Sequence, residues 1–318
     1  MGAPRRDVLV LRALGLGDLL TGIPALRALR EAFPDARIRL ACPAWLHELV
    51  LAGQLADEAV EAAPLSPLPP SAHGAWLGVN LHGRGPESTR VLLAARPRRI
   101  VSFRHAAVAQ TGGQPAWRPH EPEAARWCRL LSERGIPADP GRLTLTIPRR
   151  RSTATYTGAT LVHPGASAPA RRWPWERWAA LARSEREAGR RVVLTGTAAE
   201  RAACLRIAAA AGVPEDDVLA GRTSVLELAS VVARAALVLS GDTGVAHLAT
   251  AFGTPSVVLF GPVSPGEWGP PPERSRHRAL WAGRPGDPHG RVPDPGLLAL
   301  TPERVLAEID VLRAGLAA

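Results

Sequence analysis

Apolar and polar stretches alternate along the chain in a pattern that predicts strands followed by helices. Short apolar runs are typical of buried strands, whereas apolar residues spaced three and four positions apart indicate amphipathic helices. In the first half, the runs predict strands at 8–12, 37–41, 77–81, 100–103 and 143–147. The helical spacing predicts helices at 19–33, 44–52, 87–95 and 123–135. Strands that alternate with helices of this length favour a parallel sheet with helical crossovers.

A second series of the same kind follows the polar segment 149–157, which we interpret as a linker. Its predicted strands are 160–163, 191–195, 218–220, 236–240 and 256–260, and its predicted helices are 175–189, 198–211, 224–235, 245–253 and 302–314. Two such series predict an α/β protein with two doubly wound, Rossmann-like domains that face each other across a cleft. We expect these domains at 1–148 and 158–301, with a C-terminal helix at 302–318.

One long segment, 261–296, is rich in Pro and Gly and shows no periodicity. Long loops of this kind in compact domains are often functional. The segment could form a lid or a wall on the acceptor side, or it could be a surface excursion, and the sequence does not decide between these readings.

Composition places the chain among ordinary globular proteins, since 46% of its 318 residues are apolar. No apolar run approaches the roughly 18 residues that a membrane-spanning helix needs, and residues 1–12 hold too short an apolar segment for a signal peptide. We therefore expect a cytoplasmic protein with at most peripheral membrane contact. Its three cysteines are far apart and have no metal-ligand spacing, so they indicate small buried residues rather than a metal site or a disulfide framework.

The net charge of +10 would ordinarily suggest a nucleic-acid partner. All 39 basic residues are arginine, however, and together with the abundant Ala, Gly and Pro this indicates a GC-rich coding bias. The arginines are spread through the predicted helices, and no nucleic-acid recognition motif is present. We expect a basic cleft for anionic small molecules and no nucleic-acid partner.

The turn between the predicted strand 236–240 and the predicted helix 245–253 is suited to phosphate. Small residues at a strand-to-helix turn leave backbone N–H groups free at the positive end of the helix. We expect the amides and hydroxyl of Thr243 and Gly244 to bind a pyrophosphate, with Asp242 fixing the loop or contacting sugar hydroxyls. The same three residues match the aspartic protease signature, but such an enzyme needs two copies in β-rich lobes, and this motif occurs once.

A second turn near the N-terminus carries Gly15, Gly17 and Asp18. It does not fit the dinucleotide fingerprint, because Leu20 stands where a third Gly is needed and the second predicted strand ends without a carboxylate. The turn instead places Asp18 at or near a helix N-cap. There it could be a structural cap, since Asp is preferred at that position, or a general base for an acceptor hydroxyl. The spacing alone leaves both readings open.

A third turn, 163–174, begins at His163 and offers the hydroxyl of Ser167 and the forked cation of Arg171, which is suited to phosphate oxygens. Its tryptophans more often indicate helix packing than sugar stacking. His163 and His247 could suggest a metal ligand pair, but no carboxylate pair stands at a strand end to complete a site. We therefore expect no metal and no cofactor.

Together these turns resemble glycosyltransferase family 9, which includes the lipopolysaccharide heptosyltransferases. The matching pieces follow the family's order: GLGDLL at 15–20, PAL at 24–26, HPGAS at 163–167, RRWP at 171–174, SGDTGVAH at 240–247 and FGP at 260–262. The resemblance covers about residues 8–262. It implies a GT-B fold, with the nucleotide on the C-terminal domain and the acceptor on the N-terminal one, and an inverting reaction that needs no metal.

The resemblance also implies roles for single residues. Asp18 would be the general base, while Thr243, Gly244 and Arg171 would hold the diphosphate, with Arg171 where relatives carry Lys. The other positions that it implies for the donor pocket are Ser167, His247, Asp242 and Gly17, with Glu200 at the ribose and Thr223 near the base.

The expected partners are a nucleotide-sugar donor, with ADP-heptose as the leading candidate, and a glycan, lipid-linked or small-molecule acceptor. Two other functions remain as alternatives on sequence grounds. One is a related nucleotide-sugar epimerase or hydrolase that uses no acceptor, and the other is a non-catalytic nucleotide- or nucleic-acid-binding protein.

Overall fold

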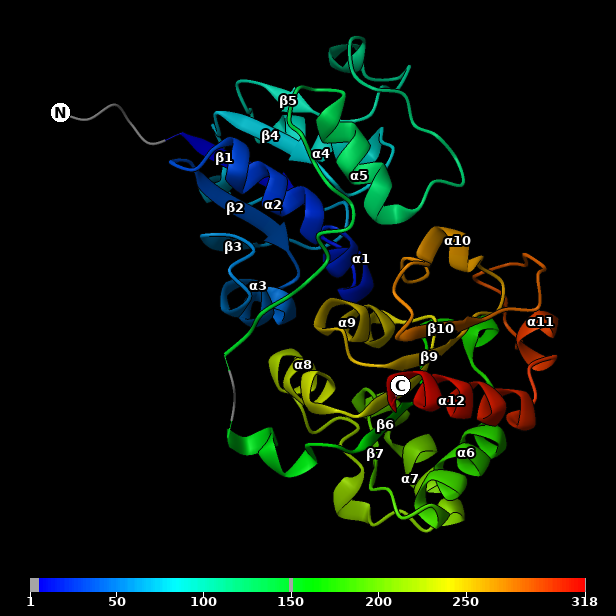
Figure 1. Ribbon diagram of the computed structural model, residues 1–318. Coiled ribbons are helices and arrows are strands. Elements are labelled where there is room, and N and C mark those ends of the chain that lie inside the picture. The colour runs from blue at the N-terminus through cyan, green and yellow to red at the C-terminus, as the bar shows by residue number, and fades with distance from the viewer. Residues whose placement is uncertain (1–5, 149–150, 318) are drawn as a thin grey trace. The chain divides into compact units, whose positions relative to one another are not determined.

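The computed structural model describes residues 6–148 and 151–317 of the chain. The fold divides into two compact units, unit 1 (Met1–Pro148) and unit 2 (Arg149–Ala318), each built on its own five-stranded parallel sheet (Figure 1). Among the described residues, no helix is both long enough and apolar enough to cross a membrane.

Unit 1 has the strand order β3-β2-β1-β4-β5, so the chain moves outward in one direction from β1 and then returns to add β4 on the other side. This reversal creates a switch point between β1 and β4, where ligands of doubly wound sheets bind. Its strands and helices are β1 (Asp7–Leu11), α1 (Leu16–Thr21), α2 (Ile23–Ala32), β2 (Arg37–Cys42), η1 (Ala44–Leu46), α3 (His47–Ala52), β3 (Glu58–Glu61), η2 (Pro70–Ala72), β4 (Leu77–Asn80), α4 (Glu87–Ala94), β5 (Ile100–Val101), η3 (Ala109–Thr111) and α5 (Glu123–Ser132).

Unit 2 repeats the plan with the order β10-β9-β8-β6-β7, and its switch point lies between β6 and β8. Its elements are η4 (Arg151–Tyr156), β6 (Thr160–His163), η5 (Pro169–Arg171), α6 (Trp175–Glu187), β7 (Val192–Leu194), η6 (Ala198–Glu200), α7 (Arg201–Ala211), η7 (Glu215–Asp217), α8 (Val225–Arg234), β8 (Leu237–Gly241), α9 (Gly244–Phe252), β9 (Ser256–Leu259), α10 (Pro265–Trp268), β10 (His277–Leu280), α11 (Pro295–Leu298) and α12 (Pro302–Ala317).

Alternate residues of the unit 2 strands point to opposite faces of the sheet, and each face has its own apolar core. Val162 and Leu239 lie in one core with residues of α6, α7 and α12. Val258 lies on the other face and packs with Ala246 of α9 and with Phe260. Because both faces are covered, the strands are apolar along their whole length rather than alternating, which is why they read as short continuous runs.

Two predicted strands are wrong. Residues 143–147 form no strand; Leu143 and Leu145 are buried, but the segment runs as an extended strap held by Arg27, which donates to the Thr144 carbonyl. Residues 218–220 make only an isolated bridge between Val218 and Leu194. A buried apolar run therefore becomes a strand only where a neighbouring strand edge is available for hydrogen bonding.

Two observed strands were not predicted. β3 is short and carries a glutamate at each end, so it lacks an apolar run. β10 lies inside the segment 261–296 and reads His-Arg-Ala-Leu. Both are edge strands, which have only one strand neighbour, and charged side chains are common at such edges.

The predicted helix 19–33 is two helices, because the chain bends at Gly22 between α1 and α2. The fully buried Arg12 side chain lies directly against Gly22, because a Cβ added at Gly22 would be 2.9 Å from Arg12 Nε. Pro24 follows in the first turn of α2, where its missing N–H is not needed. A tertiary contact, rather than local propensity, therefore sets the break.

The predicted linker 149–157 is described only from residue 151 onward, since Arg149 and Arg150 lie outside the described residues. Residues 151–156 form η4, where the Thr153 hydroxyl lies 2.8 Å from the Ser230 hydroxyl of α8. At the other end, α12 is part of unit 2, because its Ile309 and Leu312 lie in the unit's main core.

Candidate active site

The loop between β8 and α9 in unit 2 carries polar groups that have no protein partner in the part of the chain that the structure describes. Thr243 is the N-cap residue of α9, with an extended backbone (φ −146°, ψ 173°), and no side chain caps the helix. The buried Thr243 Oγ1 has no hydrogen-bond partner among the described residues. An uncapped N-terminus of a nine-residue helix next to a free hydroxyl suits an anion.

Arg171 from η5 lies beside this loop, because β6 and β8 are neighbours in the sheet. Its guanidinium is 3.6 Å from the Asp242 carboxylate, and its buried Nε has no partner among the described residues. Burial raises the pKa of Asp242 to about 6, and the cation of Arg171 opposes that rise. The structure therefore brings Arg171, Asp242 and Thr243 together at the switch point of the sheet, with donors that remain to be used.

Glu200 lies at the ends of the neighbouring strands β6 and β7. Its carboxylate accepts hydrogen bonds from the Thr197 amide (2.7 Å) and the Thr197 hydroxyl (2.9 Å). It also lies directly against Gly165, where an added Cβ would overlap the carboxylate. Ser167 is exposed on the loop after β6, and Thr223 is half-buried just before α8. These residues lie around the same end of the unit 2 sheet as Arg171.

His247 in the first turns of α9 is half-buried, and its ring centroid lies 6.0 Å from that of Trp268 in an edge-to-face arrangement. Trp268 and Trp281 pack against the small core cluster that Ala246 of α9 forms with Val258 and Phe260. Part of the segment 261–296 thus forms an aromatic cluster against α9. His163, in contrast, is a buried structural residue, with Nδ1 3.0 Å from Thr195 Oγ1 and a pKa lowered by burial.

In unit 1, Asp18 is the third residue of α1, and Gly15 is the N-cap. The carboxylate Oδ2 accepts the Gly15 amide hydrogen at 3.2 Å. Asp18 thus satisfies one N-terminal amide of the helix, as a structural role requires, while its side chain is only half-buried. Gly17 also belongs to unit 1, where its carbonyl accepts a hydrogen bond from Thr21 (3.1 Å), whereas the other predicted donor residues belong to unit 2.

Arg12, which no sequence motif indicated as a site residue, holds the loop that carries Asp18. The fully buried guanidinium donates to the backbone carbonyls of Asp18 and Leu81, and to Thr21 Oγ1 at 2.9 Å. It also lies 4.9 Å from the ring centroid of Trp127. The sequence feature that could have indicated Arg12 is its position directly after a buried strand. A guanidinium is stable in such a buried place only where several hydrogen-bond acceptors surround it.

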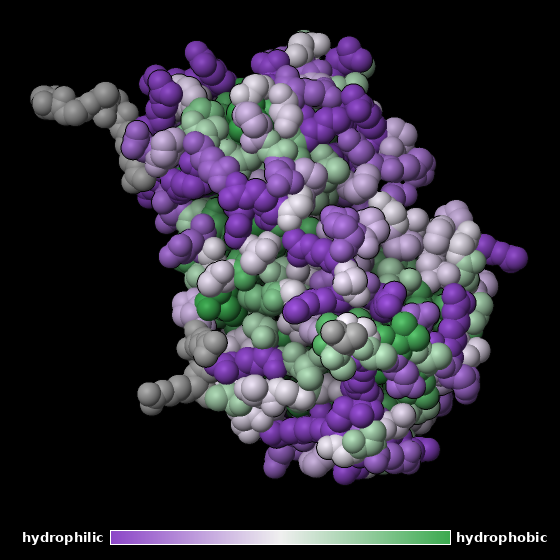
Figure 2. Space-filling model, viewed as in Figure 1, coloured by the Kyte–Doolittle hydropathy of each residue, from purple (hydrophilic) through white to green (hydrophobic). Residues whose placement is uncertain are grey.

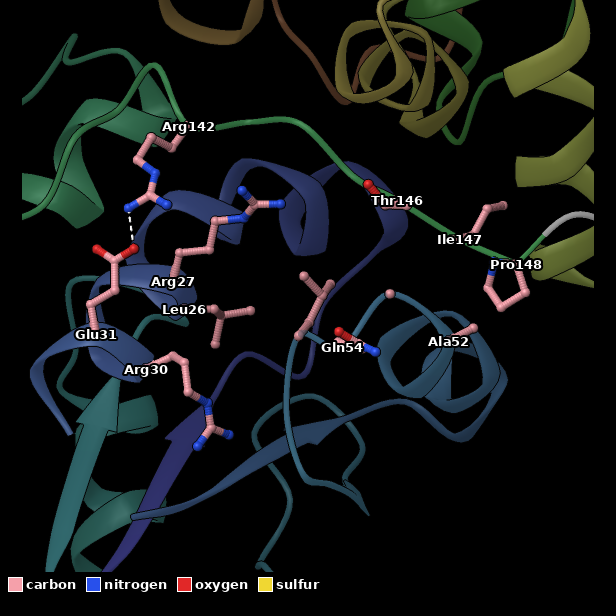
Figure 3. Close-up of a pocket in the computed structure, with 12 residues that line it drawn as sticks. Leu26, Arg27, Arg30, Glu31, Ala52, Gln54, Arg142, Thr146, Ile147 and Pro148 are labelled. Carbon is pink, nitrogen blue, oxygen red and sulfur yellow. Dashed lines mark hydrogen bonds and ion pairs between the residues drawn. The ribbon is translucent and has the colours of Figure 1, made fainter. Parts of the chain in front are cut away.

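Unit 1 also holds a cavity of about 480 Å³ between α2, the end of α3 and residues 142–148, which include the strap 143–147 (Figure 3). Its three arginines already have protein partners. Arg142 and Arg30 form ion pairs with Glu31 and Asp57, respectively. Arg27 donates a hydrogen bond to a backbone carbonyl of the strap. None of the predicted site residues lines it.

On the face shown in Figure 2, hydrophilic and hydrophobic residues are interspersed over both units. Within 6–148 and 151–317, no three His, Cys, Asp or Glu side chains come together as a metal site would require.

Comparison with known proteins gives a consistent result. The family model described as glycosyltransferase family 9 (heptosyltransferase) matches residues 114–289. Lipopolysaccharide heptosyltransferase 2 of Escherichia coli K12 is 27% identical, over 96% of this chain and 98% of its own length.

Two solved structures share the architecture. The E. coli ADP-heptose lps heptosyltransferase II aligns with a TM-score of 0.77 and 22% identity, covering 98% of this chain and all (100%) of that one. The E. coli heptosyltransferase WaaC, solved with ADP, aligns with a TM-score of 0.71 and 17% identity, covering 96% of this chain and 99% of that one. These likenesses show that the chain has the fold of those transferases, the GT-B fold. Because the family model matches more than half of the sequence, the chain belongs to glycosyltransferase family 9 and is a glycosyltransferase.

Proposed function

We propose that this chain transfers a heptose from ADP-heptose to a hydroxyl group of a lipopolysaccharide-type glycan, with inversion and without a metal ion. The observation that carries the proposal is a pair of unused donors in unit 2, Arg171 Nε and Thr243 Oγ1, beside the uncapped N-terminus of α9. The choice of ADP-heptose and lipopolysaccharide rests on what two relatives are called: the solved E. coli ADP-heptose lps heptosyltransferase II and the E. coli lipopolysaccharide heptosyltransferase 2.

In this proposal the diphosphate lies at the N-terminus of α9, with Arg171 as its cation. Negative charge grows on the diphosphate as its bond to the anomeric carbon breaks. Fixed amide dipoles and a guanidinium therefore stabilise the transition state more than the bound donor. The same groups supply the charge that a metal provides in other transferases, which supports metal independence. Ser167 and His247 would line this pocket, Glu200 would contact the ribose, and Thr223 would lie near the base.

Asp18 is the proposed general base. It takes the proton from the acceptor hydroxyl while the oxygen forms a bond to the anomeric carbon and the bond to the diphosphate breaks. A single displacement of this kind inverts the configuration. The half-buried carboxylate has one oxygen bonded to Gly15 and a second that can accept the proton. Arg12, which bonds the Asp18 carbonyl, would keep this turn in place.

The decisive experiment pairs variants of the two units. We expect Asp18→Asn to lower transfer of heptose to lipopolysaccharide by about 10²- to 10⁴-fold, the usual contribution of a general base, and to leave ADP affinity unchanged. Arg171→Ala should weaken ADP binding by about 10- to 100-fold, because a hydrogen bond to a charged group contributes roughly 1.5–3 kcal/mol. Isothermal titration with ADP and a radiolabel transfer assay measure the two effects.

Three results would contradict the proposal. Transfer that is unchanged in Asp18→Asn would exclude that residue as the base. Strong inhibition by EDTA would refute the metal-free mechanism. Release of ADP from ADP-heptose at the same rate with and without lipopolysaccharide would indicate a hydrolase rather than a transferase.

A further inference from the structure

The loop after β4, residues 81–86, begins beside the loop that carries Asp18. Strands β1 and β4 pair with Leu11 opposite Asn80, and the Leu81 amide donates to the Leu11 carbonyl at 3.0 Å. Arg12 donates to the carbonyls of both Leu81 and Asp18, so a single buried side chain ties the two loops together. This pair of loops forms the switch point of the unit 1 sheet, where a ligand of that unit is expected.

The backbone of His82, the second residue of this loop, is anchored by Asn80. The fully buried Asn80 donates its amide hydrogens to Ser88 and Thr89 of α4, both at 3.0 Å. Its Oδ1 accepts the His82 backbone N–H, also at 3.0 Å. The backbone of His82 is therefore anchored to the start of α4.

The imidazole ring of His82 is held in one tautomer. The Ala13 backbone N–H donates to Nδ1 at 3.2 Å, so Nδ1 carries no hydrogen, and in the neutral ring the hydrogen is on Nε2. Burial lowers the pKa of His82, the cation of Arg12 lowers it further, and the carboxylate of Asp18 offsets only part of this effect. The neutral ring is therefore the favoured form. Its Nε2–H has no hydrogen-bond partner among the described residues.

Two backbone amides of one short loop thus position two side chains. The Ala13 amide holds the ring of His82, and the Gly15 amide, two residues later, holds the carboxylate of Asp18. Both side chains are half-buried. A ligand oxygen at this switch point can therefore meet one group that accepts a proton and one group that donates a hydrogen bond.

We propose that His82 contacts the acceptor substrate, with its Nε2–H donating a hydrogen bond to an acceptor oxygen held beside the Asp18 carboxylate. The inference rests on the proposed function and adds a second substrate-binding residue to it. A neutral donor fits this place because it orients a sugar oxygen without competing for the proton that Asp18 removes.

Two substitutions separate the ring's structural bond from its proposed contact with substrate. In His82→Asn, the amide oxygen can still accept the Ala13 N–H, but nothing reaches the position of Nε2. In His82→Gln, the longer side chain can bring an amide N–H near that position. His47, a half-buried histidine whose Nε2 lies 3.2 Å from the Cys42 carbonyl, provides the matched control His47→Asn.

The assay measures heptose transfer from ADP-heptose to lipopolysaccharide that is purified from a bacterial strain without heptosyltransferase 2. The melting temperature of every variant is measured as well. We expect His82→Asn to lower kcat/KM for this lipopolysaccharide by about 3- to 10-fold, the usual effect of one hydrogen bond, while KM for ADP-heptose and the melting temperature stay unchanged. His82→Gln should recover most of the loss, and His47→Asn should behave as the wild type.

The outcomes distinguish this inference from the proposed function. If the wild type is active and His82→Asn has the same kinetics, the proposed role of His82 is wrong, while the proposed function still stands. A loss of similar size in His82→Gln and His47→Asn would also overturn that role, because the effect would then be structural. A wild type that transfers no heptose to any such lipopolysaccharide would overturn the proposed function, and the inference would fall with it.

Discussion

Replacing Asp242 with Asn should make the unliganded protein more stable at neutral pH. Asp242 is 7% exposed, and its partner Arg171 lies 3.6 Å away, too far to compensate fully for burial. Burial raises the pKa of Asp242 from 3.8 to about 6, which corresponds to about 3 kcal/mol. Asn has nearly the same shape and carries no charge. Arg171 is 26% exposed, so water can solvate it when its partner is neutral.

The sign of the pH dependence follows from proton linkage. Between pH 3.8 and about 6 the folded state holds a proton on Asp242 that the unfolded state has lost. Wild-type stability therefore decreases as the pH rises through this window, and the full cost is present above about pH 6. The stability gain of Asp242→Asn should be up to about 3 kcal/mol at about pH 8, shrinking to about 1 kcal/mol at about pH 4.5.

Urea unfolding without ADP, followed by tryptophan fluorescence from about pH 4.5 to about pH 8, measures this gain. Asp217→Asn is the matched control, because Asp217 is also buried in unit 2 but pairs with Arg191 at 2.6 Å. That control should destabilise the protein. A gain for Asp242→Asn that does not change with pH, or a loss of stability above about pH 6, would show that the Asp242 carboxylate does not destabilise the folded protein.

Two further predictions concern packing and a buried ion pair. Gly22→Ala should displace Arg12, because Arg12 Nε would lie only 2.9 Å from the new Cβ. We expect both the transfer activity and the melting temperature to fall. Wild-type values for both would show that Arg12 can move without cost. Burial raises the pKa of Glu185, but the hydrogen bonds from Arg313, Arg190 and Thr160 together outweigh burial, and the pKa is about 2. Glu185→Gln should therefore cost up to about 3 kcal/mol at neutral pH, and this difference should fade as the pH drops from 4.5 toward 2, as urea unfolding at several pH values would show. The exposed neighbour Glu187→Gln should cost nothing measurable, and an equal cost for both would contradict this assignment.

Most of the strands and helices near the sheet centres could be predicted because local pattern and global fold agree there. The strands β6, β8 and β9 are buried on both faces, so their apolar runs are continuous and end at turns of small residues. The edge strands β3 and β10 escaped prediction, because an edge needs less apolar surface and tolerates charge. The strap at 143–147 has the burial pattern of a strand without a strand beside it.

The residue types of the candidate site and their order along the chain follow from local sequence patterns. Strand-to-helix turns have local signatures, and these signatures led to Asp18, Arg171 and Thr243. Which loops are neighbours depends instead on the order of the strands in each parallel sheet, and that order is a property of the folded chain. Arg12 and His82 illustrate this point, because each links the ends of β1 and β4, and 65 residues of chain lie between Leu11 and Leu77. No local pattern contains that contact, since its partners are backbone groups that become available only after the sheet has formed.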